Sequence, residues 1–381
     1  MHFEAGEPGR LVLRDGESTL AEYVYAPTDA ALESPRPYLL LRTRSGADVT
    51  AYRPDDHVWH KGLSLALPNV GPHNFWGGPT YVRAEGYVQL PNNGAQVHGE
   101  FVASDTPIAD AAAALARIDE VLDWRSQDGA PVLTEHRTLT ARSAGDDAWA
   151  LTWRSSLVNA TPEPLAFGSP TSKGRDDAGY AGIFWRGPSD WSGGDILGPD
   201  GEAGDAARGG TGPWLAFVAP DRSASVLVLE AAPAGAPWFA RSAEYAGLCP
   251  APFFFDETVL EPGGTLVLAA ALVIGGPDAA SLASTVGANL VAELRAVPDA
   301  GTGLAPETDP AEDSASPRDA DTGRTPEPDP MSDPATAPNP EPAPVPDPDP
   351  APAPTPDSEP APTPTPATPS TPEATPEDTP A

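Results

Sequence analysis

Cysteine and lysine are nearly absent from this sequence of 381 residues. Cys249 is the single cysteine, so no intramolecular disulfide can form, which fits a reducing compartment. Lys61 and Lys173 are the only lysines, beside 20 arginines. Because the chain otherwise uses arginine, the positions of these two lysines are informative, and both fall in segments that we single out below.

Long apolar runs are missing too. The longest, residues 266–274, has nine residues, whereas a membrane-spanning helix needs roughly 20. The first residues, MHFEAGEPGR, show no basic segment followed by an apolar one, so no signal peptide is expected. We therefore expect a cytoplasmic protein that has no contact with a membrane.

Positive charge is scarce. The formal net charge is −33, and the last 81 residues contribute 17 acidic and 2 basic side chains. The rest of the chain, with 38 acidic and 20 basic residues, still carries −18. Neither part offers the basic surface that neutralises phosphates, so nucleic acid and anionic lipid are not expected as partners.

Short signatures of common enzyme classes are absent as well. The sequence contains no GxSxG elbow, Walker loop, GxGxxG or CxxC motif. These absences argue against the common hydrolase, nucleotide-binding and redox families. We expect no cofactor and no resident metal.

Proline dominates the C-terminal part, where from residue 305 it recurs every second or third position among Asp, Glu, Thr and Ala. Proline lacks the amide donor and fixes φ, and this segment has no aromatic side chain to bury. Residues 298–381 are therefore predicted to be a disordered, extended tail. It is either a ligand for a proline-recognising protein or a solubilising spacer.

A period of two marks residues 1–297 as one all-β domain, a large β-sandwich. Trp149, Leu151 and Trp153 alternate with small or polar residues, which places them on one face of a strand. The Asp128-Gly129 pair separates two strand-like segments and predicts a hairpin. Residues 38–43, 226–229 and 265–274 are predicted to be further strands.

Helical periodicity appears once, near the end of this domain. Asp278 is predicted to cap a short C-terminal helix with Leu282, Val286, Leu290 and Leu294 on one stripe. Pro298 ends it. This helix gives the predicted boundary between domain and tail.

Two glycine-rich segments have the composition of loops that shape a ligand pocket. Residues 52–87 hold three of the six histidines, and residues 168–187 hold a polar loop that leads into Ile183-Phe184-Trp185. From them we predict three catalytic residues, His57, His60 and Asp176. We predict seven ligand-binding residues: Arg53, Lys61, Asn74, Trp76, Lys173, Arg175 and Tyr180.

Other interpretations of these residues remain open. The histidines are either an acid/base pair, hydrogen-bonded structural residues, or metal ligands together with Glu85, His98 or His136. Trp59, Trp76 and Trp185 either form a platform for a sugar ring or pack in the core.

Four runs in these regions resemble one bacterial family: DHVWHKGL, HNFWGGPTYV, EHRTLT and SPTSKGRDDAGYAGIFWRGP. The sequence is similar to the PmoA-like family ("methane oxygenase PmoA", a domain of unknown function) over about residues 10–296. The name implies an oxygenase, but the chain has no membrane segment like that of true methane monooxygenase, so we take it as a label.

The resemblance implies a galactose-mutarotase-like supersandwich and a place among sugar-metabolising proteins. By analogy with mutarotases, His57 or His60 is the acid and Glu85, Glu230 or Glu257 the base. The leading hypothesis is a protein that acts on a sugar or sugar derivative by histidine acid/base chemistry. Two alternatives are a non-catalytic sugar-binding or scaffold module tethered by the tail, and a metal-dependent enzyme.

Overall fold

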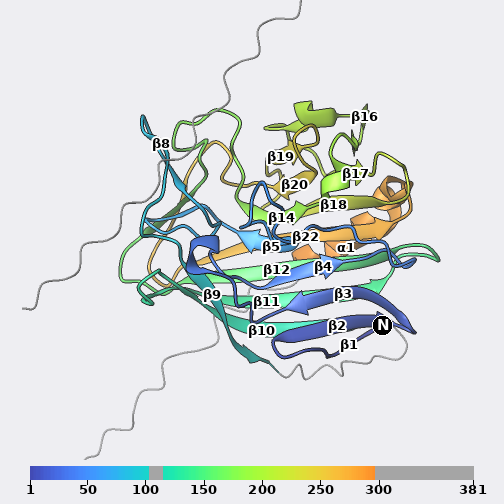
Figure 1. The fold of residues 1–381 in the computed structure, drawn as a ribbon, viewed down its shortest axis with the longest axis horizontal. Helices are drawn as coiled ribbons and strands as arrows, with labels where there is room; N and C mark the ends of the chain where they lie inside the picture. The colour runs from blue at the N-terminus through green and yellow to red at the C-terminus, as the bar shows by residue number, and fades with distance from the viewer. Residues whose placement is uncertain (103–114, 297–381) are drawn as a thin grey trace, which may run out of the picture. The chain divides into compact units, whose positions relative to one another are not determined.

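The computed structural model of this protein describes residues 1–102 and 115–296 (Figure 1). These residues lie in one compact unit that is built almost entirely from antiparallel strands. The predicted tail, residues 298–381, lies outside the described residues. Among the described residues, no helix is long and apolar enough to cross a membrane.

One large sheet has eight strands and combines the N-terminal strands with strands from the middle of the chain. In spatial order its strands are β1 (His2–Ala5), β2 (Arg10–Asp15), β3 (Ser18–Val24), β4 (Tyr38–Leu41), β5 (Leu63–Ala66), β14 (Gly182–Arg186), β20 (Gly247–Pro250) and β19 (Trp238–Arg241).

The second large sheet has nine strands, in the order β16 (Gly201–Glu202), β15 (Asp195–Gly198), β17 (Trp214–Val218), β18 (Ser225–Ala232), β22 (Thr265–Gly275), β12 (Trp149–Asn159), β11 (Pro131–Ser143), β10 (Ala116–Arg125) and β9 (Ala95–Phe101). Two small sheets complete the fold: β21 (Thr258–Leu260), β13 (Leu165–Gly168) and β6 (Asn69–Val70), and β7 (Thr80–Val82) with β8 (Gly86–Val88).

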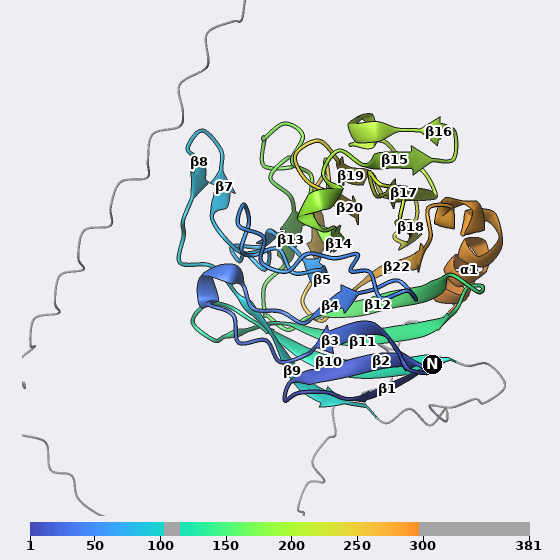
Figure 2. The same cartoon turned by 45° about the vertical axis from the view of Figure 1, so that its right-hand side comes forward.

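The two large sheets stack face to face (Figures 1 and 2) and enclose the main apolar core, which draws residues from both. The packing of strand β22 explains why its sequence is continuously apolar. Leu268, Ala270 and Leu272 point into this core, whereas Ala269, Ala271 and Val273 belong to a second cluster on the opposite face. Both faces of the strand are therefore buried. The prediction of an all-β sandwich is confirmed.

The individual strand predictions are confirmed as well. Trp149, Leu151 and Trp153 all lie in the core between the sheets. Strands β10 and β11 form the predicted hairpin, with Gly129 in its turn at a φ of 88°. A positive φ favours glycine because it has no Cβ to clash with the backbone.

The C-terminal helix is present but is not one regular α-helix. The chain forms a 3-10 turn (Ala279–Leu282), a π turn (Ala283–Gly287) and then α1 (Ala288–Ala296). On a regular α-helix, residues spaced four apart rotate around the helix axis by about 40° at each step and so leave the face that packs on the sheet. The π turn has more residues per turn, which reduces this rotation and keeps the four side chains on the sheet side. Leu290 and Leu294 are buried there as predicted. The Asp278 side chain makes no cap hydrogen bond, which corrects that prediction.

A charged network lies buried in the sandwich. The Arg137 guanidinium donates to both carboxylate oxygens of Glu135, at 2.8 and 2.9 Å, and to the hydroxyl of Tyr23 at 3.1 Å. Tyr23 in turn donates to Glu120 on β10. The Arg137 and Glu135 side chains are fully buried, and the guanidinium also lies 4.5 Å from the centroid of the Trp153 ring. These contacts connect the two sheets through polar groups.

Three further 3-10 turns lie between strands: η1 (Ala31–Glu33), η2 (Ser189–Trp191) and η3 (Gly204–Ala207). The first of them supplies the buried Glu33, which organises one of the loops described next.

Candidate functional site

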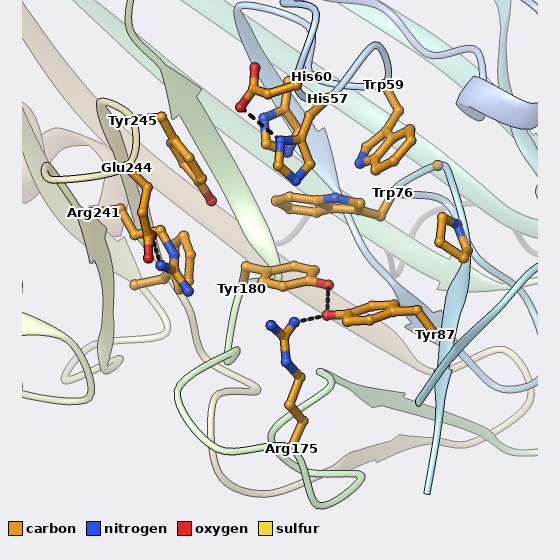
Figure 3. Close-up of a pocket in the computed structure, with 14 residues that line it drawn as sticks. His57, Trp59, His60, Trp76, Tyr87, Arg175, Tyr180, Arg241, Glu244 and Tyr245 are labelled. Carbon is orange, nitrogen blue, oxygen red and sulfur yellow. Dashed lines mark hydrogen bonds and ion pairs between the residues drawn. The ribbon is translucent and has the colours of Figure 1, made fainter. Parts of the chain in front are cut away.

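A cavity of about 600 Å³ opens on the outer face of the eight-stranded sheet. Ile183 and Trp185 on β14 point into the sandwich, whereas Phe184 between them points outward into a third apolar cluster beneath the cavity. The segments 52–61 and 76–87 form one part of its wall, and residues 175–180 and 239–245 form the other. Its lining (Figure 3) consists of Asp56, His57, Trp59, His60, Trp76, Gly77, Pro79, Tyr87, Arg175, Tyr180, Phe239, Arg241, Glu244 and Tyr245.

Arg36 holds the two loops together. Its buried guanidinium donates to the backbone carbonyl of Trp59 at 2.7 Å and to that of Trp76 at 2.9 Å. Burial lowers the pKa of Arg36 to about 10, so it remains charged at neutral pH. The loops also meet where Gly78 (φ 66°) passes under Trp59, since a Cβ at Gly78 would lie 2.8 Å from the indole ring. These contacts explain the glycines of the HNFWGGP run.

Asp56, His57 and Arg186 form a connected group at one wall of the cavity. The His57 Nδ1 atom lies 2.8 Å from the Asp56 carboxylate, and the Arg186 guanidinium lies 3.0 Å from both Asp56 oxygens. A neutral His57 therefore donates its Nδ1 hydrogen to Asp56 and carries its free lone pair on Nε2. In Figure 3 the edge of the His57 ring that points away from Asp56 faces the cavity. The group has the arrangement of an oriented general base.

His60 stacks on His57 with ring centroids 4.6 Å apart and planes at 9°. Its Nδ1 accepts a hydrogen bond from Arg186 at 3.2 Å, so its ring hydrogen lies on Nε2. Burial lowers the pKa of His60 well below its usual value, and the neighbouring His57 and Arg186 act in the same direction. His60 is therefore neutral at neutral pH and packs against the His57 ring, and its catalytic role stays a prediction.

Lowering the pH below about 6.5 is expected to destabilise the protein through His60. Between that pH and its lower folded pKa, the unfolded chain binds a proton at His60 that the folded protein does not bind. The contribution of neutral His60 to the free energy of unfolding is complete above pH 6.5 and falls by at most about 1.4 kcal/mol per pH unit below it. Thermal unfolding between pH 7.5 and 5 checks this, and His60→Asn should flatten the dependence.

His73 provides the comparison for this experiment, because burial also lowers its pKa. His73 lies outside the cavity lining, and its ring is only half-buried. We expect His73→Asn to flatten the dependence less than His60→Asn does. If stability depends on pH with the same slope in the wild type and in His60→Asn, the assignment of a neutral buried His60 is wrong.

Aromatic side chains form the other walls. The rings of Trp76 and Tyr180 lie with centroids 4.4 Å apart, and the Tyr180 hydroxyl lies 2.8 Å from that of Tyr87. The ring of Tyr245 lies 5.8 Å from that of His57, centroid to centroid, and its hydroxyl points toward the cavity (Figure 3). Burial raises the pKa of Tyr245 to about 12. Tyr245 is therefore a protonated hydrogen-bond donor at neutral pH.

Five of the ten predicted residues line this cavity: His57, His60, Trp76, Arg175 and Tyr180. The two glycine-rich segments thus meet at one place, although their residues are about a hundred positions apart. The functional roles of these five residues remain predictions.

Lys61 and Arg53 lie outside this lining, and their ligand contacts stay predictions. The Lys61 ammonium is fully buried, 2.9 Å from Asp29, and also pairs with Glu33. Arg53 pairs with Glu33 at 2.7 Å. Both cations are thus occupied by carboxylates from the segment before β4, and they fix the loop.

Asn74, Lys173 and Asp176 are also outside the lining. Asn74 is buried, and its side-chain oxygen accepts from the backbone N–H groups of Trp76 and Gly77 at 2.8 and 3.0 Å. It shapes the turn that carries Trp76. Lys173 pairs with Glu257, and Asp176 is exposed on its loop. Neither of the two lysines is therefore among the residues that line the cavity.

The sequence interpretation missed Asp56, Arg186, Tyr245, Arg241 and Glu244. Asp56 directly precedes His57 in the sequence, so a carboxylate next to a histidine was the signal that could have identified it. The last two enter from β19 and the turn after it, where no local pattern signals a site. The glutamates considered as the mutarotase-type base, Glu85, Glu230 and Glu257, do not line the cavity.

No group of three or more His, Cys, Asp or Glu side chains within residues 1–102 and 115–296 is placed to hold a metal ion. In particular, His98 pairs with Glu120 at 2.6 Å, and neither residue lines the cavity with His57 and His60.

Comparison with known proteins gives a family but no activity. Residues 10–285 match the model of a family of unknown function, DUF6807. This range agrees with the span of the predicted resemblance, whereas the PmoA name is not part of the match. None of the curated proteins matches significantly.

Three solved structures show distant similarity. The Slr1438 protein from Synechocystis sp. PCC 6803 is 13% identical, with a TM-score of 0.36 over 71% of this chain and 96% of that one. An α-galactosidase from Lactobacillus brevis is 10% identical, with a TM-score of 0.31 over 72% and 38%. HI1317 is 8% identical, with a TM-score of 0.25 over 72% and 98%. Likeness at this level indicates neither an activity nor a site.

Proposed function

We propose that this chain, which belongs to the DUF6807 family of unknown function, binds a sugar or sugar derivative in its aromatic cavity and acts on it by general acid/base catalysis. The observation that carries the proposal is the Asp56–His57 pair at the wall of a cavity lined by Trp59, Trp76 and Tyr180. The apolar faces of sugar rings pack on aromatic side chains, while polar groups fix their orientation.

The base in this proposal is His57. Its Nε2 lone pair accepts a proton from a substrate hydroxyl while Asp56 stabilises the imidazolium that forms. Arg186 keeps Asp56 ionised and in place, because its guanidinium contacts both carboxylate oxygens. The pKa of Asp56 is lowered accordingly, by its hydrogen bonds to His57 and Arg186, which outweigh the opposing effect of burial.

The acid is Tyr245, which carries its proton at neutral pH. The Arg186 guanidinium lies 4.0 Å from the centroid of its ring and stabilises the tyrosinate that is left after proton transfer. In opening of a sugar ring, His57 takes the proton of the anomeric hydroxyl, the ring C–O bond breaks, and Tyr245 protonates the released oxygen. Ring closure reverses these transfers, and no cofactor is consumed.

A panel of neutral and acidic monosaccharides tests the binding step. We expect saturable binding by calorimetry or ligand-observed NMR, and about fivefold weaker binding in Trp59→Leu, because leucine covers roughly 40 Å² less of the apolar face of a sugar ring, which corresponds to about 1 kcal/mol. Equal thermal unfolding of the two proteins serves as the control for folding. Absence of binding to every sugar would remove the proposal.

The non-catalytic sugar-binding module is the second candidate, and the same aromatic lining supports it. It differs in one result: binding would persist without anomer exchange or any other turnover, in the wild type as well as in His57 variants. The metal-dependent alternative finds no supporting ligand cluster in residues 1–102 and 115–296. A partner for the proline-rich tail is a separate proposal, tested by pull-down with proline-recognising domains against a chain truncated after residue 300.

The predicted resemblance to PmoA-like proteins supports the sugar assignment, since it implies a place among sugar-metabolising proteins. It adds no site residue beyond those already described. The oxygenase part of the name is not part of this proposal.

A further inference from the structure

Two arginines from different parts of the chain line the cavity away from the Asp56–His57 pair. Arg175 comes from the loop between β13 and β14, and Arg241 ends β19. Figure 3 shows both guanidinium groups on the Tyr180 side of the cavity, across from His57. A chain with 55 acidic and 22 basic residues thus places two cations in one cavity.

Arg241 is compensated by a carboxylate of the cavity itself. It forms an ion pair with Glu244, and its side chain is only 15% exposed. Its pKa is lowered, first by burial and also by the nearby positive charges of Arg208 and Arg175. Arg175 and Arg241 thus belong to the lining of one cavity, and Arg241 is the one that carries its own counter-charge.

Arg175 has no carboxylate partner among residues 1–102 and 115–296. Its guanidinium donates to the Tyr87 hydroxyl and lies 4.7 Å from the centroid of the Tyr87 ring. The Tyr87 hydroxyl is held in turn by Tyr180 at 2.8 Å. The side chain is thus positioned by neutral groups, and its charge remains available to a ligand.

The charges of the lining determine what kind of anion fits. Asp56 is neutralised by Arg186, and Glu244 by Arg241, so the net charge that remains at the cavity is the single positive charge of Arg175. One uncompensated guanidinium matches a monoanion. Its planar pair of N–H donors also matches a carboxylate, which it binds with two parallel hydrogen bonds.

We propose that the ligand of this cavity is a sugar acid, namely a uronic acid, whose carboxylate binds Arg175 while its ring lies on Trp76 and Tyr180 toward His57. The inference rests on the proposed function and narrows its substrate class. The carboxylate fixes the direction of the substrate, so that its opposite end meets the base.

Matched pairs of ligands test this inference. Calorimetric titration of the full-length protein compares D-glucuronate with D-glucose and D-galacturonate with D-galactose. At least one acid should bind about tenfold or more tightly than its neutral partner, because a charge-assisted pair strengthens binding by about that factor or more. Raising the NaCl concentration should reduce this preference.

Variants separate the carboxylate contact from the rest of the site. Arg175→Gln should abolish the preference and leave the affinity for the neutral sugar within about threefold, whereas Arg222→Gln should behave like the wild type. Arg222 is a suitable control because it is an exposed arginine in one ion pair with Asp195, away from the cavity.

The possible failures are distinguishable. If neutral sugars bind as tightly as their acids, or if Arg175→Gln keeps the preference, the sugar-acid inference is wrong while the proposed function stands. If glucose 6-phosphate binds more tightly than every acid, the argument for a monoanion is wrong. If no sugar binds at all, both proposals are wrong.

Discussion

Replacing His57 with glutamine is expected to reduce turnover of the sugar substrate by about 10²- to 10⁴-fold, the usual contribution of a positioned acid or base. Glutamine keeps the polarity and much of the volume of histidine but cannot accept a proton near neutral pH. Substrate binding should change by no more than a few fold, because Trp76, Tyr180 and Arg175 remain. Anomer exchange measured by NMR, together with calorimetry on the same protein, separates the two effects.

Asp56→Asn should show an intermediate loss. The amide can still contact His57, but it can present its N–H group and thereby select the wrong imidazole tautomer, and it cannot stabilise an imidazolium. It also leaves the Arg186 guanidinium without its counter-charge. We therefore expect turnover to be fastest at a different pH in Asp56→Asn than in the wild type. A purely structural defect would lower the rate without moving this pH optimum.

His73→Gln is the matched control for both variants. His73 lies on the same chain segment as His57 but not in the cavity lining. Its activity should equal that of the wild type. If His73→Gln and His57→Gln lose activity equally, or if neither loses any, then His57 is not the base.

The sequence predicted the architecture because burial leaves a local pattern. Trp149, Leu151 and Trp153 alternate on one strand, and the spacing is visible without knowledge of the partner strand. The same holds for the hairpin turn at Gly129, whose φ of 88° favours glycine. The helix was predicted in place but not in type, since spacing alone does not distinguish an α turn from a π turn.

The site was only partly predictable because half of it depends on contacts between distant strands. Trp76 and Tyr180 lie in segments whose richness in aromatics and glycine is visible in the sequence. Arg241 and Tyr245 reach the cavity only because β19 pairs with β20 and β20 pairs with β14, a register that no local pattern reveals. The partners of Lys61 could not be predicted for the same reason: Asp29 and Glu33, which pair with its ammonium, lie about thirty residues earlier.

Replacing Arg137 with methionine is expected to lower the free energy of unfolding by about 3–5 kcal/mol, the usual result of removing one partner from a buried ion pair. Methionine fills much of the space, so the cost comes chiefly from charge. Glu135 is fully buried and would lose both guanidinium hydrogen bonds, while Tyr23 and Gln96 would each lose one. Urea unfolding of the wild type and the variant measures the difference.

A second variant tests whether the uncompensated charge is the cause. Adding Glu135→Gln to Arg137→Met removes the buried carboxylate that has lost its partner, so the double variant should be more stable than Arg137→Met alone. The introduced amide can still accept the hydrogen bond that Trp124 donates to Glu135 at 2.7 Å. Arg117→Met is the control, since Arg117 pairs with Asp119 at the surface and such pairs contribute about 0–1 kcal/mol. A loss below about 1 kcal/mol in Arg137→Met would mean that this ion pair, which lies within β11, contributes little to the stability of the fold. A double variant less stable than the single one would mean that the unpaired carboxylate is not the cause of the loss.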